Sequence, residues 1–402
     1  MDATLSTEAL QRELLAVVPG AERKEAVLQI LNNIRIDADG DTVRLATTTL
    51  YKSAQSELEA TVSAAGSTTV HAQRLASLVR RLTARDVRIV VEGDSLLVKS
   101  GKASLKLPTL DADKFPALSD PSGKKIKVSI DKLTTAINQA RYAVAPEGAR
   151  DDLQAMQVTC NAGRISVAGV DGHRLSEAAF VEQEATTDWS CMIPRTNLDL
   201  LLRFLSDAKS AVKGSEEPEA EAKVLAFVND KHVFFCHGTR TIAIVQAPEQ
   251  LPPYAKMIPK GQARRIRVNR SEMLGALSLL VTLSEEKANS MEFLLVGDEL
   301  TIEAKDASKG EGRSSIVVEH EFKPDDGDEY RITLNGGYVA QLFESMPTKE
   351  VDILLGNTPL VAPLAFPVYP PLPKEEGEEH DGEGAKLDDR PSLTGLIMPL
   401  RG

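Results

Sequence analysis

The sequence predicts an α+β protein built from three similar domains in one chain. A short amphipathic helix that runs into a strand occurs three times. The spacing is about 120–140 residues, which suits tandem domains and is too long for a solenoid. Each of these units follows another amphipathic helix and a strand hairpin. Alternating strands combined with segregated helices are typical of antiparallel sheets that helices cover on one side.

The three repeats occupy matching places along the chain. Helices that lead into strands are expected at 74–82, 197–205 and 338–346, with strands at 87–90 and 351–355. The helices upstream of them carry apolar residues at helical spacing: Leu10, Leu14 and Leu15; Leu133, Ile137 and Ala140; Met273, Leu277 and Leu280. Their hairpins are expected at 34–45, 156–167 and 293–302. Such repetition favours a pseudo-symmetric assembly whose function lies in its whole shape.

Composition shifts divide the chain into expected domains at 1–120, 126–260 and 263–402. The polar, turn-forming segment Asp120–Lys125 reads as the first linker. Residues 374–390 are rich in Glu, Asp and Gly, which predicts a disordered acidic loop ahead of a final apolar strand. A solvated spacer with no role is the simpler interpretation of that charge run.

Bulk composition excludes several classes of protein. The net charge of −12 disfavours a chain coated by nucleic acid over its whole exterior, although it allows a local basic surface. The three cysteines, Cys160, Cys191 and Cys236, form no even disulfide framework, so we expect a reducing cytoplasm. The N-terminus lacks a secretory signal and no apolar run of about 18 residues exists, so no membrane partner is expected.

Catalytic and cofactor motifs are weak. Asp171 and His173 could form an acid/base pair, but they lie on an expected turn and no nucleophile accompanies them. The alternative is a strand–turn–strand corner in which Gly172 supplies an unusual backbone angle. The segment Ser122–Lys125 lacks the glycine and hydroxyl residue of a phosphate-binding loop, and adjacent Cys236 and His237 do not suit a metal site. No metal or cofactor is therefore expected.

Basic residues concentrate on the expected helices: Arg74, Arg80, Arg81, Arg85, Lys132, Arg141, Arg195, Arg203, Lys209 and Lys213. If these helices share one surface, a locally positive face would suit the phosphodiester backbone, which is bound by charge without reading sequence. Ordinary charge on solvated helix surfaces is the alternative interpretation. The third domain weakens the first interpretation, because its helices add little beyond Arg270 and Lys287.

Over nearly its whole length the chain resembles the bacterial DNA polymerase III β subunit family, the β sliding clamps. The resemblance is carried by six segments in order: Leu28–Ile34, Ser100–Pro116, Asp171–Leu175, Leu251–Pro259, Asn335–Tyr338 and Met398–Arg401. It implies a DNA-clamp fold with antiparallel sheets outside and helices inside, and two chains closed head to tail into a homodimeric ring. Leu105 and Leu107 of one chain would then meet Thr282 and Leu283 of the other.

The resemblance also implies a function. The ring would encircle double-stranded DNA without reading sequence, act as a processivity factor in DNA replication and have no catalytic site. Its partners would be the DNA polymerase III α subunit, other proteins with clamp-binding motifs and the clamp loader. A specialised clamp paralogue (plasmid, phage or resistance-associated), and an enzyme that uses Asp171 and His173, are the alternatives.

Site residues follow from the same resemblance. The expected DNA contacts are Arg23, Lys24, Arg80, Arg150, Arg195 and Arg203. Partner peptides would dock in a groove made by Leu153, Val170, Gly172, His173, Arg174, Leu175, Pro252, Lys256, Met257, Asn335, Tyr338, Val361, Met398, Pro399 and Leu400. Apolar and flexible Met side chains would form an adaptable slot, and His173, Arg174 and Asn335 would bond the peptide. Val170, where the family often has Thr, and Ala288, where an aromatic is common, alter the expected peptide preference.

Overall fold

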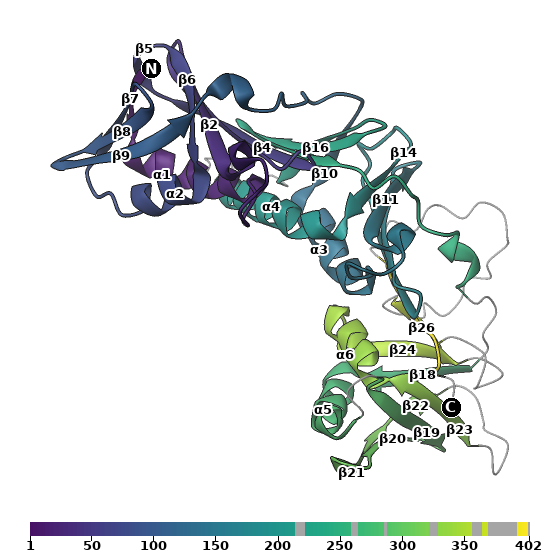
Figure 1. Ribbon diagram of the computed structural model, residues 1–402. Helices are drawn as coiled ribbons and strands as arrows, with labels where there is room; N and C mark the ends of the chain where they lie inside the picture. The colour runs from purple at the N-terminus through teal and green to yellow at the C-terminus, as the bar shows by residue number, and fades with distance from the viewer. Residues whose placement is uncertain are drawn as a thin grey trace. The chain divides into compact units, whose positions relative to one another are not determined.

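The computed structural model of the chain describes residues 1–213, 222–258, 264–284, 288–320, 329–355, 364–368 and 392–400. The expected acidic loop at 374–390 lies outside these residues. The chain forms two compact units, drawn in Figure 1: the first is Met1–Asp131 with Thr196–Gln246, and the second is Lys132–Arg195 with Ala247–Gly402. Both units contain part of the predicted segment 126–260.

The first unit is organised by one antiparallel sheet of thirteen described strands, in the order β10-β15-β16-β17-β4-β3-β2-β6-β9-β8-β7-β1-β5. Its strands are β1 Asp2–Ser6, β2 Asn33–Asp39, β3 Thr42–Thr48, β4 Lys52–Glu59, β5 Thr61–Ala64, β6 Gly66–His71, β7 Asp86–Glu92, β8 Ser95–Ser100, β9 Ala103–Leu110, β10 Lys124–Ser129, β15 Lys223–Val228, β16 His232–His237 and β17 Arg240–Val245. Pairing of β17 with β4, in which Thr241 faces Gln55, makes this sheet continuous across two predicted domains.

Helices α1 (Thr7–Val17), α2 (Ala72–Val79) and α4 (Leu198–Lys213) belong to the first unit, and α1 contacts β3, β4 and both other helices. In Figure 1 they lie along one side of the sheet. Ser6 caps α1 by accepting the Ala9 N–H at 3.4 Å. Leu10 and Leu14 of α1 are buried, as the helical spacing predicts. Short 3₁₀ turns are η1 Val18–Gly20, η2 Gln29–Asn32 and η3 Ala112–Lys114.

The second unit contains two antiparallel sheets. One has nine described strands in the order β14-β11-β12-β13-β26-β25-β24-β18-β22, and the other has four in the order β21-β20-β19-β23. The strands are β11 Ala155–Asn161, β12 Arg164–Val170, β13 Arg174–Val181, β14 Trp189–Pro194, β18 Arg264–Asn269, β19 Ser290–Val296, β20 Glu299–Asp306, β21 Gly310–Val317, β22 Glu319–His320, β23 Tyr330–Asn335, β24 Glu350–Leu355, β25 Leu364–Val368 and β26 Ser392–Ile397. β26 pairs with β13, so the last strand joins the predicted third domain to the second.

Helices α5 (Arg270–Leu280) and α6 (Gly336–Ser345) lie in the second unit and pack on each other. Helix α3 (Ile130–Ala140) begins at the end of the first unit and continues into the second. The 3₁₀ turns are η4 Arg141–Ala143, η5 Asp151–Leu153, η6 Arg195–Asn197, η7 Tyr254–Lys256 and η8 Val281–Leu283.

The predicted repeats are confirmed, with differences at their ends. Helices α2, α4 and α6 run into strands, and helices α1, α3 and α5 precede strand hairpins, as the sequence pattern predicts. Helix α4 continues to Lys213, whereas the sequence reading ended it at Leu205. The extension follows from the residues themselves, because good helix formers continue without a breaker up to Gly214.

Candidate functional site

An apolar cluster in the second unit contains several of the residues expected in the groove. Its buried members come from strands, loops and the turn η5, far apart in the chain: Ala145, Leu153, Ala155, Ala168, Val170, Leu175, Met192, Leu251 and Leu396. Partly buried Tyr254, Ile258, Leu354 and Met398 pack against it. The structure therefore brings together Leu153, Val170, Leu175 and Met398, which the sequence reading placed in one groove.

The turn between β12 and β13 borders this cluster. Gly172 has a φ of 91°, a backbone angle that side chains other than glycine rarely adopt. Asp171 Oδ1 accepts the backbone N–H groups of His173 at 2.9 Å and of Arg174 at 3.0 Å. Its Oδ2 lies 2.9 Å from Arg174 Nε. Both oxygens of Asp171 therefore hold the turn and its arginine, which is the role that the corner interpretation assigns to this motif.

The Arg174 guanidinium contacts several residues of the second unit. Its guanidinium carbon lies 4.0 Å from the ring centroid of Tyr338 and 5.1 Å from that of Tyr142. The guanidinium also donates to the Tyr142 carbonyl at 2.7 Å and to the side-chain oxygen of Gln341. Burial raises the pKa of Tyr142 to about 12, so this ring stays neutral beside the arginine. All three guanidinium nitrogens of Arg174 therefore donate to acceptors within the chain.

Other polar groove residues are also engaged. The Asn335 carboxamide accepts the Tyr338 N–H at 3.0 Å and so caps helix α6. His173 is an exposed side chain, and its ring centroid lies 6.3 Å from that of Tyr338. The sequence reading assigned His173, Arg174 and Asn335 alike to peptide binding. Of the three side chains, only that of His173 is presented to solvent.

The chain end and the segment before β18 border the same cluster. The Met398 N–H donates to the His173 carbonyl at 2.9 Å, and the Leu400 N–H donates to the Thr333 carbonyl at 2.9 Å. The Tyr254 hydroxyl lies 3.2 Å from a Glu177 carboxylate oxygen, and burial raises the pKa of this tyrosine. The remaining expected groove residues of these two segments, which are at least partly exposed, are Pro252, Lys256, Met257 and Pro399. Val361 lies outside the described residues.

A basic hollow lies in the first unit. Three of the expected DNA contacts, Arg23, Arg80 and Arg203, line one hollow of about 350 Å³. They come from the loop after η1, the end of α2 and helix α4. The other lining residues are Leu15, Val18, Pro19, Gln73, Ala76 and Ser77. Like charges that share a hollow favour an anion between them, and phosphate is such an anion.

A second hollow, of about 660 Å³, shares Leu15 and Arg203 with the first. It adds Arg12 of α1, together with His237 and Arg240 of the β16–β17 hairpin. Two acidic residues, Glu13 and Asp207, line it as well. The sequence reading missed Arg12, although its position on α1 one turn before Leu15 is a signal that helical spacing could have supplied.

Arg150 and Arg195 belong to the second unit, so the first unit's hollows are built without them. Arg150 forms an ion pair with Asp152 at 2.5 Å, and Arg195 donates to the Val144 carbonyl. Lys24 is exposed on the same loop as Arg23. The expected DNA contacts therefore form one group of four in the first unit, and two arginines with internal partners in the second.

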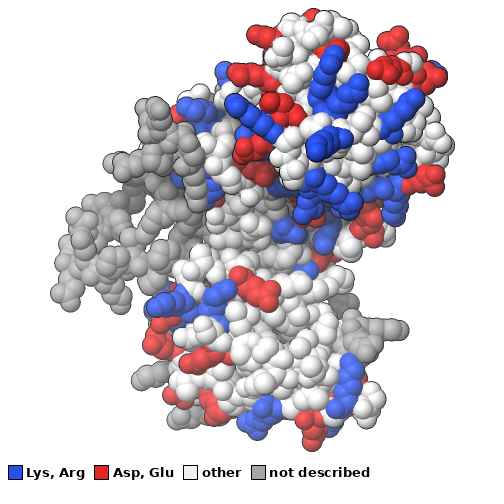
Figure 2. All heavy atoms as spheres, turned by 90° about the vertical axis from the view of Figure 1, so that its left-hand side faces the viewer, with Lys and Arg blue, Asp and Glu red and all other residues white. Residues whose placement is uncertain are grey.

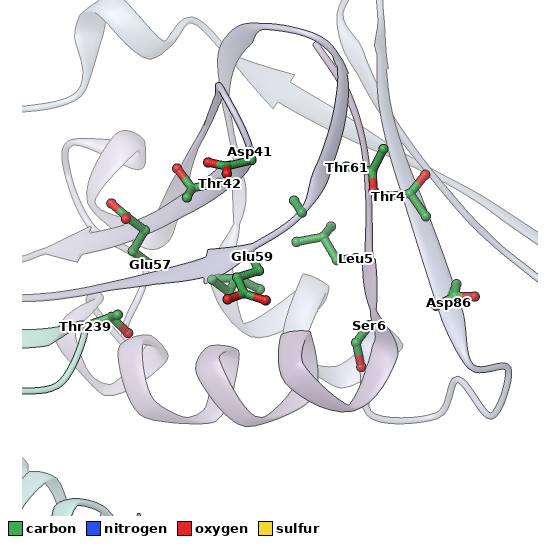
Figure 3. Close-up of a pocket in the computed structure, with 12 residues that line it drawn as sticks. Thr4, Leu5, Ser6, Asp41, Thr42, Glu57, Glu59, Thr61, Asp86 and Thr239 are labelled. Atoms are coloured by element: carbon green, nitrogen blue, oxygen red, sulfur yellow. The ribbon is translucent and has the colours of Figure 1, made fainter.

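Charge is unevenly spread over the first unit. Figure 2 shows Lys and Arg side chains gathered on the upper part of one face, which this unit forms. Elsewhere in the unit an acidic hollow of about 790 Å³ is lined by Asp41, Glu57, Glu59 and Asp86 (Figure 3). Four carboxylates repel phosphates, so this hollow is unsuited to a nucleic acid backbone.

The residues expected at a dimer interface lie at sheet edges or helix ends. On β9, Leu105 is half-buried and Leu107 is buried. This strand pairs with β8 along its length but with β6 only through Thr109 and Leu110, among the described strands. Thr282 and Leu283 form the turn after α5, where Thr282 is exposed. Next to them, the Leu279 side chain is 69% exposed.

The chain is similar in sequence to known proteins. Residues 1–119 match the family model of the DNA polymerase III beta subunit, N-terminal domain. The chain is 26% identical to the beta sliding clamp of Pseudomonas putida over 364 residues, which cover 89% of this chain and 94% of that protein. It is 25% identical to the beta sliding clamp of Caulobacter vibrioides over 379 residues, covering 92% and 97%. The chain is therefore similar to bacterial beta sliding clamps over about nine-tenths of its length.

Solved structures of sliding clamps share the fold of this chain. The DNA polymerase III subunit beta of Pseudomonas aeruginosa superposes with a TM-score of 0.85 at 23% identity, and the match covers 100% of both chains. The corresponding subunit of Thermotoga maritima gives a TM-score of 0.82 at 16% identity, covering 100% and 99%. The fold is thus shared along the whole chain, well beyond residues 1–119.

Two negative findings hold for the described part of the chain. It contains no group of three or more His, Cys, Asp or Glu side chains arranged to hold a metal ion. None of its helices has the length and apolar character that a membrane span requires.

Proposed function

We propose that the chain works as a DNA sliding clamp, in which two copies close head to tail into a ring around duplex DNA. The ring tethers the replicative polymerase to its template in the cytoplasm. The observation that carries this proposal is the similarity to β sliding clamps over about nine-tenths of the chain, together with the same fold throughout. A closed ring stays on the DNA because it encloses the duplex. Individual contacts to phosphates can therefore stay weak, which allows the clamp to slide.

Dimer closure is proposed to use two sheet edges. The first part of β9, residues 103–108, leaves one edge open among the described strands, and β21 is the outer strand of the four-stranded sheet. Pairing of such edges between two chains satisfies backbone groups that would otherwise invite aggregation. Exposed Leu279, with Thr282 and Leu283, would add apolar contact at the junction.

DNA contact is proposed for Arg23, Lys24, Arg80 and Arg203 in the first unit. Their shared hollow supports this assignment, because sequence-independent binding needs cations that a phosphate backbone can reach together. Arg12, which lines the neighbouring hollow through a 65% exposed side chain, is added to this set. Arg150 and Arg195 are proposed as weaker contributors, because neither lines the two basic hollows of the first unit.

Partner proteins are proposed to dock through a short peptide on the apolar cluster of the second unit. Met398 and Tyr254 border the cluster, and Met257 is 40% exposed on the neighbouring segment. Flexible Met side chains can adapt to several apolar anchors, as a surface that serves several partners requires. The DNA polymerase III α subunit and the clamp loader are the proposed partners of this groove.

Retention on circular DNA tests the proposal. The protein is incubated with nicked circular DNA, a bacterial clamp loader and ATP, and the DNA is then separated by gel filtration. A sliding clamp stays with the circle and is lost when the DNA is cut once, whereas a conventional binder is indifferent to the cut. Equal retention on circular and linear DNA would refute the proposal. The Leu279→Asp variant, altered at an exposed position, should be monomeric and fail to stay on the circle.

A further inference from the structure

The loop at residues 22–32 in the first unit is built around one buried side chain. Asn32 is only 8% exposed, although it is polar and lies at the end of an exposed loop. Its Nδ2 donates to the carbonyls of Glu22 at 3.0 Å and of Lys24 at 2.7 Å. Its Oδ1 accepts the Ala26 N–H at 3.0 Å. One buried carboxamide therefore forms hydrogen bonds with three backbone groups of the loop and stabilises the loop conformation.

Further hydrogen bonds close the same loop. The Glu22 N–H donates to the Leu31 carbonyl at 3.0 Å, which joins the two ends of the loop. The Glu22 carboxylate turns back and accepts the Arg23 N–H at 2.9 Å, so its charge is directed to the loop backbone. The loop is therefore preformed, and the places of Arg23 and Lys24 depend on Asn32.

The loop presents basic and apolar side chains to solvent, together with Glu25 and Gln29. Arg23 lines the basic hollow with Arg80 and Arg203, and Lys24 is exposed beside it. At the tip, the Val27 side chain is fully exposed and Leu28 is 56% exposed. Burial, and after it the positive charge of Arg23, lower the pKa of Lys52, while the Glu22 carboxylate opposes the shift, so Lys52 is a further cation near this loop. Cations beside an exposed apolar tip suit duplex DNA, whose phosphates border apolar sugar faces.

We propose that the loop at residues 22–32 is a preformed DNA-contacting element in which Asn32 is the positioning residue. Asn32 holds Arg23 and Lys24 towards phosphates and keeps Val27 at the tip against the sugars of the same duplex. The inference rests on the proposed clamp function and assigns a role to a residue that cannot itself reach the DNA. The apolar tip supplies contact that does not depend on salt, and the two cations supply contact that does.

The first experiment measures how the affinity for a labelled linear duplex depends on salt, in the Asn32→Ala variant of the full chain. Losing two phosphate contacts should reduce the slope of log affinity against log salt by about 1 to 2. In an Arg23→Ala/Lys24→Ala background, Asn32→Ala should cause no further loss, because its effect passes through those cations. An unchanged slope, or an equal loss in both backgrounds, would overturn the positioning role.

Asn33→Ala is the matched control. Asn33 is the next residue, is also buried, and donates at 3.1 Å to Thr69 Oγ1 rather than to the loop. The Asn33→Ala variant should keep the wild-type slope of log affinity against log salt, even if its melting temperature is lower. Where Asn32→Ala itself unfolds the chain, Asn32→Ser replaces it, because its shorter side chain cannot span the three loop atoms. A control slope that falls as far as that of Asn32→Ala would contradict the proposal.

The tip is tested by Val27→Ser. Loss of an apolar contact releases no counterions, so affinity should fall about fivefold with an unchanged salt slope. Val296→Ser, at a 55% exposed position of the second unit, should leave affinity unaltered. Equal affinities of Val27→Ser and wild type would remove the tip from the interface. If the wild-type protein is not retained on circular DNA, the clamp function fails; if it is retained and the loop variants behave as wild type, only this inference fails.

Discussion

The guanidinium of Arg174 lies over the ring of Tyr338, with 4.0 Å between its central carbon and the ring centroid. Arg174 begins β13 and Tyr338 lies in the first turn of α6, so the contact joins a turn of the predicted second domain to a helix of the third. Cation–π contact adds to the ion pair with Asp171, which lies 2.9 Å away. The Arg174 side chain therefore links the β12–β13 turn to helix α6.

Replacing Arg174 by Lys should weaken peptide binding and lower stability together. Lysine keeps the charge but loses the planar fork that serves Asp171, Tyr142 and Gln341 at once. We expect a loss of about 2 kcal/mol in unfolding free energy, because Asp171 would keep a buried charge with a poorer partner. Peptide affinity should fall about tenfold. Denaturant unfolding and fluorescence anisotropy with a clamp-binding peptide measure the two effects.

Arg150→Lys is the control for that change. Its side chain is 72% exposed and pairs only with Asp152 in the described contacts, so the same replacement should change stability by less than about 0.5 kcal/mol. If both variants bind peptide like wild type, Arg174 does not shape the groove.

Met398→Ala should weaken peptide binding while it leaves the dimer intact. Met398 is partly buried at the edge of the apolar cluster, so truncation removes contact area without opening the core. Leu153→Ala should weaken binding too, but Leu153 is 5% exposed and its loss should also lower stability by about 2–5 kcal/mol. Anisotropy and sedimentation measure binding and assembly. An unchanged peptide affinity of Met398→Ala would mean that the groove lies elsewhere.

Periodicity was sufficient to predict the repeated helices and hairpins, because the apolar residues that signal them are neighbours in sequence. Leu10 and Leu14, for example, are one turn apart and are both buried. Resemblance to the clamp family added the groove residues, and Leu153, Val170 and Leu175 do lie in one cluster. The local sequence pattern thus predicts the repeated elements of the fold, and the family resemblance predicts apolar residues of the candidate site.

The partners of the polar residues could not be predicted in this way. Arg174 bonds Gln341, 167 residues away, and Glu13 bonds Arg240, 227 residues away. No sequence pattern signals such pairs, since they depend on how the sheets join. For the same reason Arg174 and Asn335 read as peptide ligands, whereas their side chains bond within the chain. The role of Asn32 could not be predicted either, because the sequence does not distinguish a buried asparagine from an exposed asparagine in a loop.

The Glu13–Arg240 pair predicts a specific pH dependence. Burial would raise the pKa of Glu13, but hydrogen bonds from Arg240, Ser56 and Arg12 outweigh it and lower the pKa from 4.5 to about 2. A lowered carboxyl pKa stabilises the fold above pH 4.5, and this contribution is lost as the pH falls from about 4.5 to 2. The difference in pKa corresponds to roughly 3 kcal/mol at neutral pH.

Glu13→Gln should therefore lower the unfolding free energy by about 2–3 kcal/mol at pH 7, and the difference from wild type should shrink towards zero near pH 2. Glu8→Gln, at an exposed position on the same helix, should change stability by only a few tenths of a kcal/mol. Denaturant titrations at several pH values measure both variants. A Glu13→Gln difference that stays constant from pH 7 to pH 3 would contradict the assigned ion pair.

Two glycines of the second unit should respond oppositely to the same substitution. A Cβ at Gly169 on β12 would lie 2.7 Å from the Ala140 carbonyl oxygen and 3.0 Å from the Val144 backbone nitrogen. Neither backbone atom can move aside without shifting η4, so Gly169→Ala should destabilise the chain by about 1–3 kcal/mol. A Cβ at Gly275 on α5 would meet nothing within 4 Å. Gly275→Ala should therefore stabilise the helix by about 0.5–1 kcal/mol, because alanine has the higher helix propensity. Thermal melts of the two variants test the pair, and a Gly169→Ala protein as stable as wild type would show that β12 and η4 do not pack this closely.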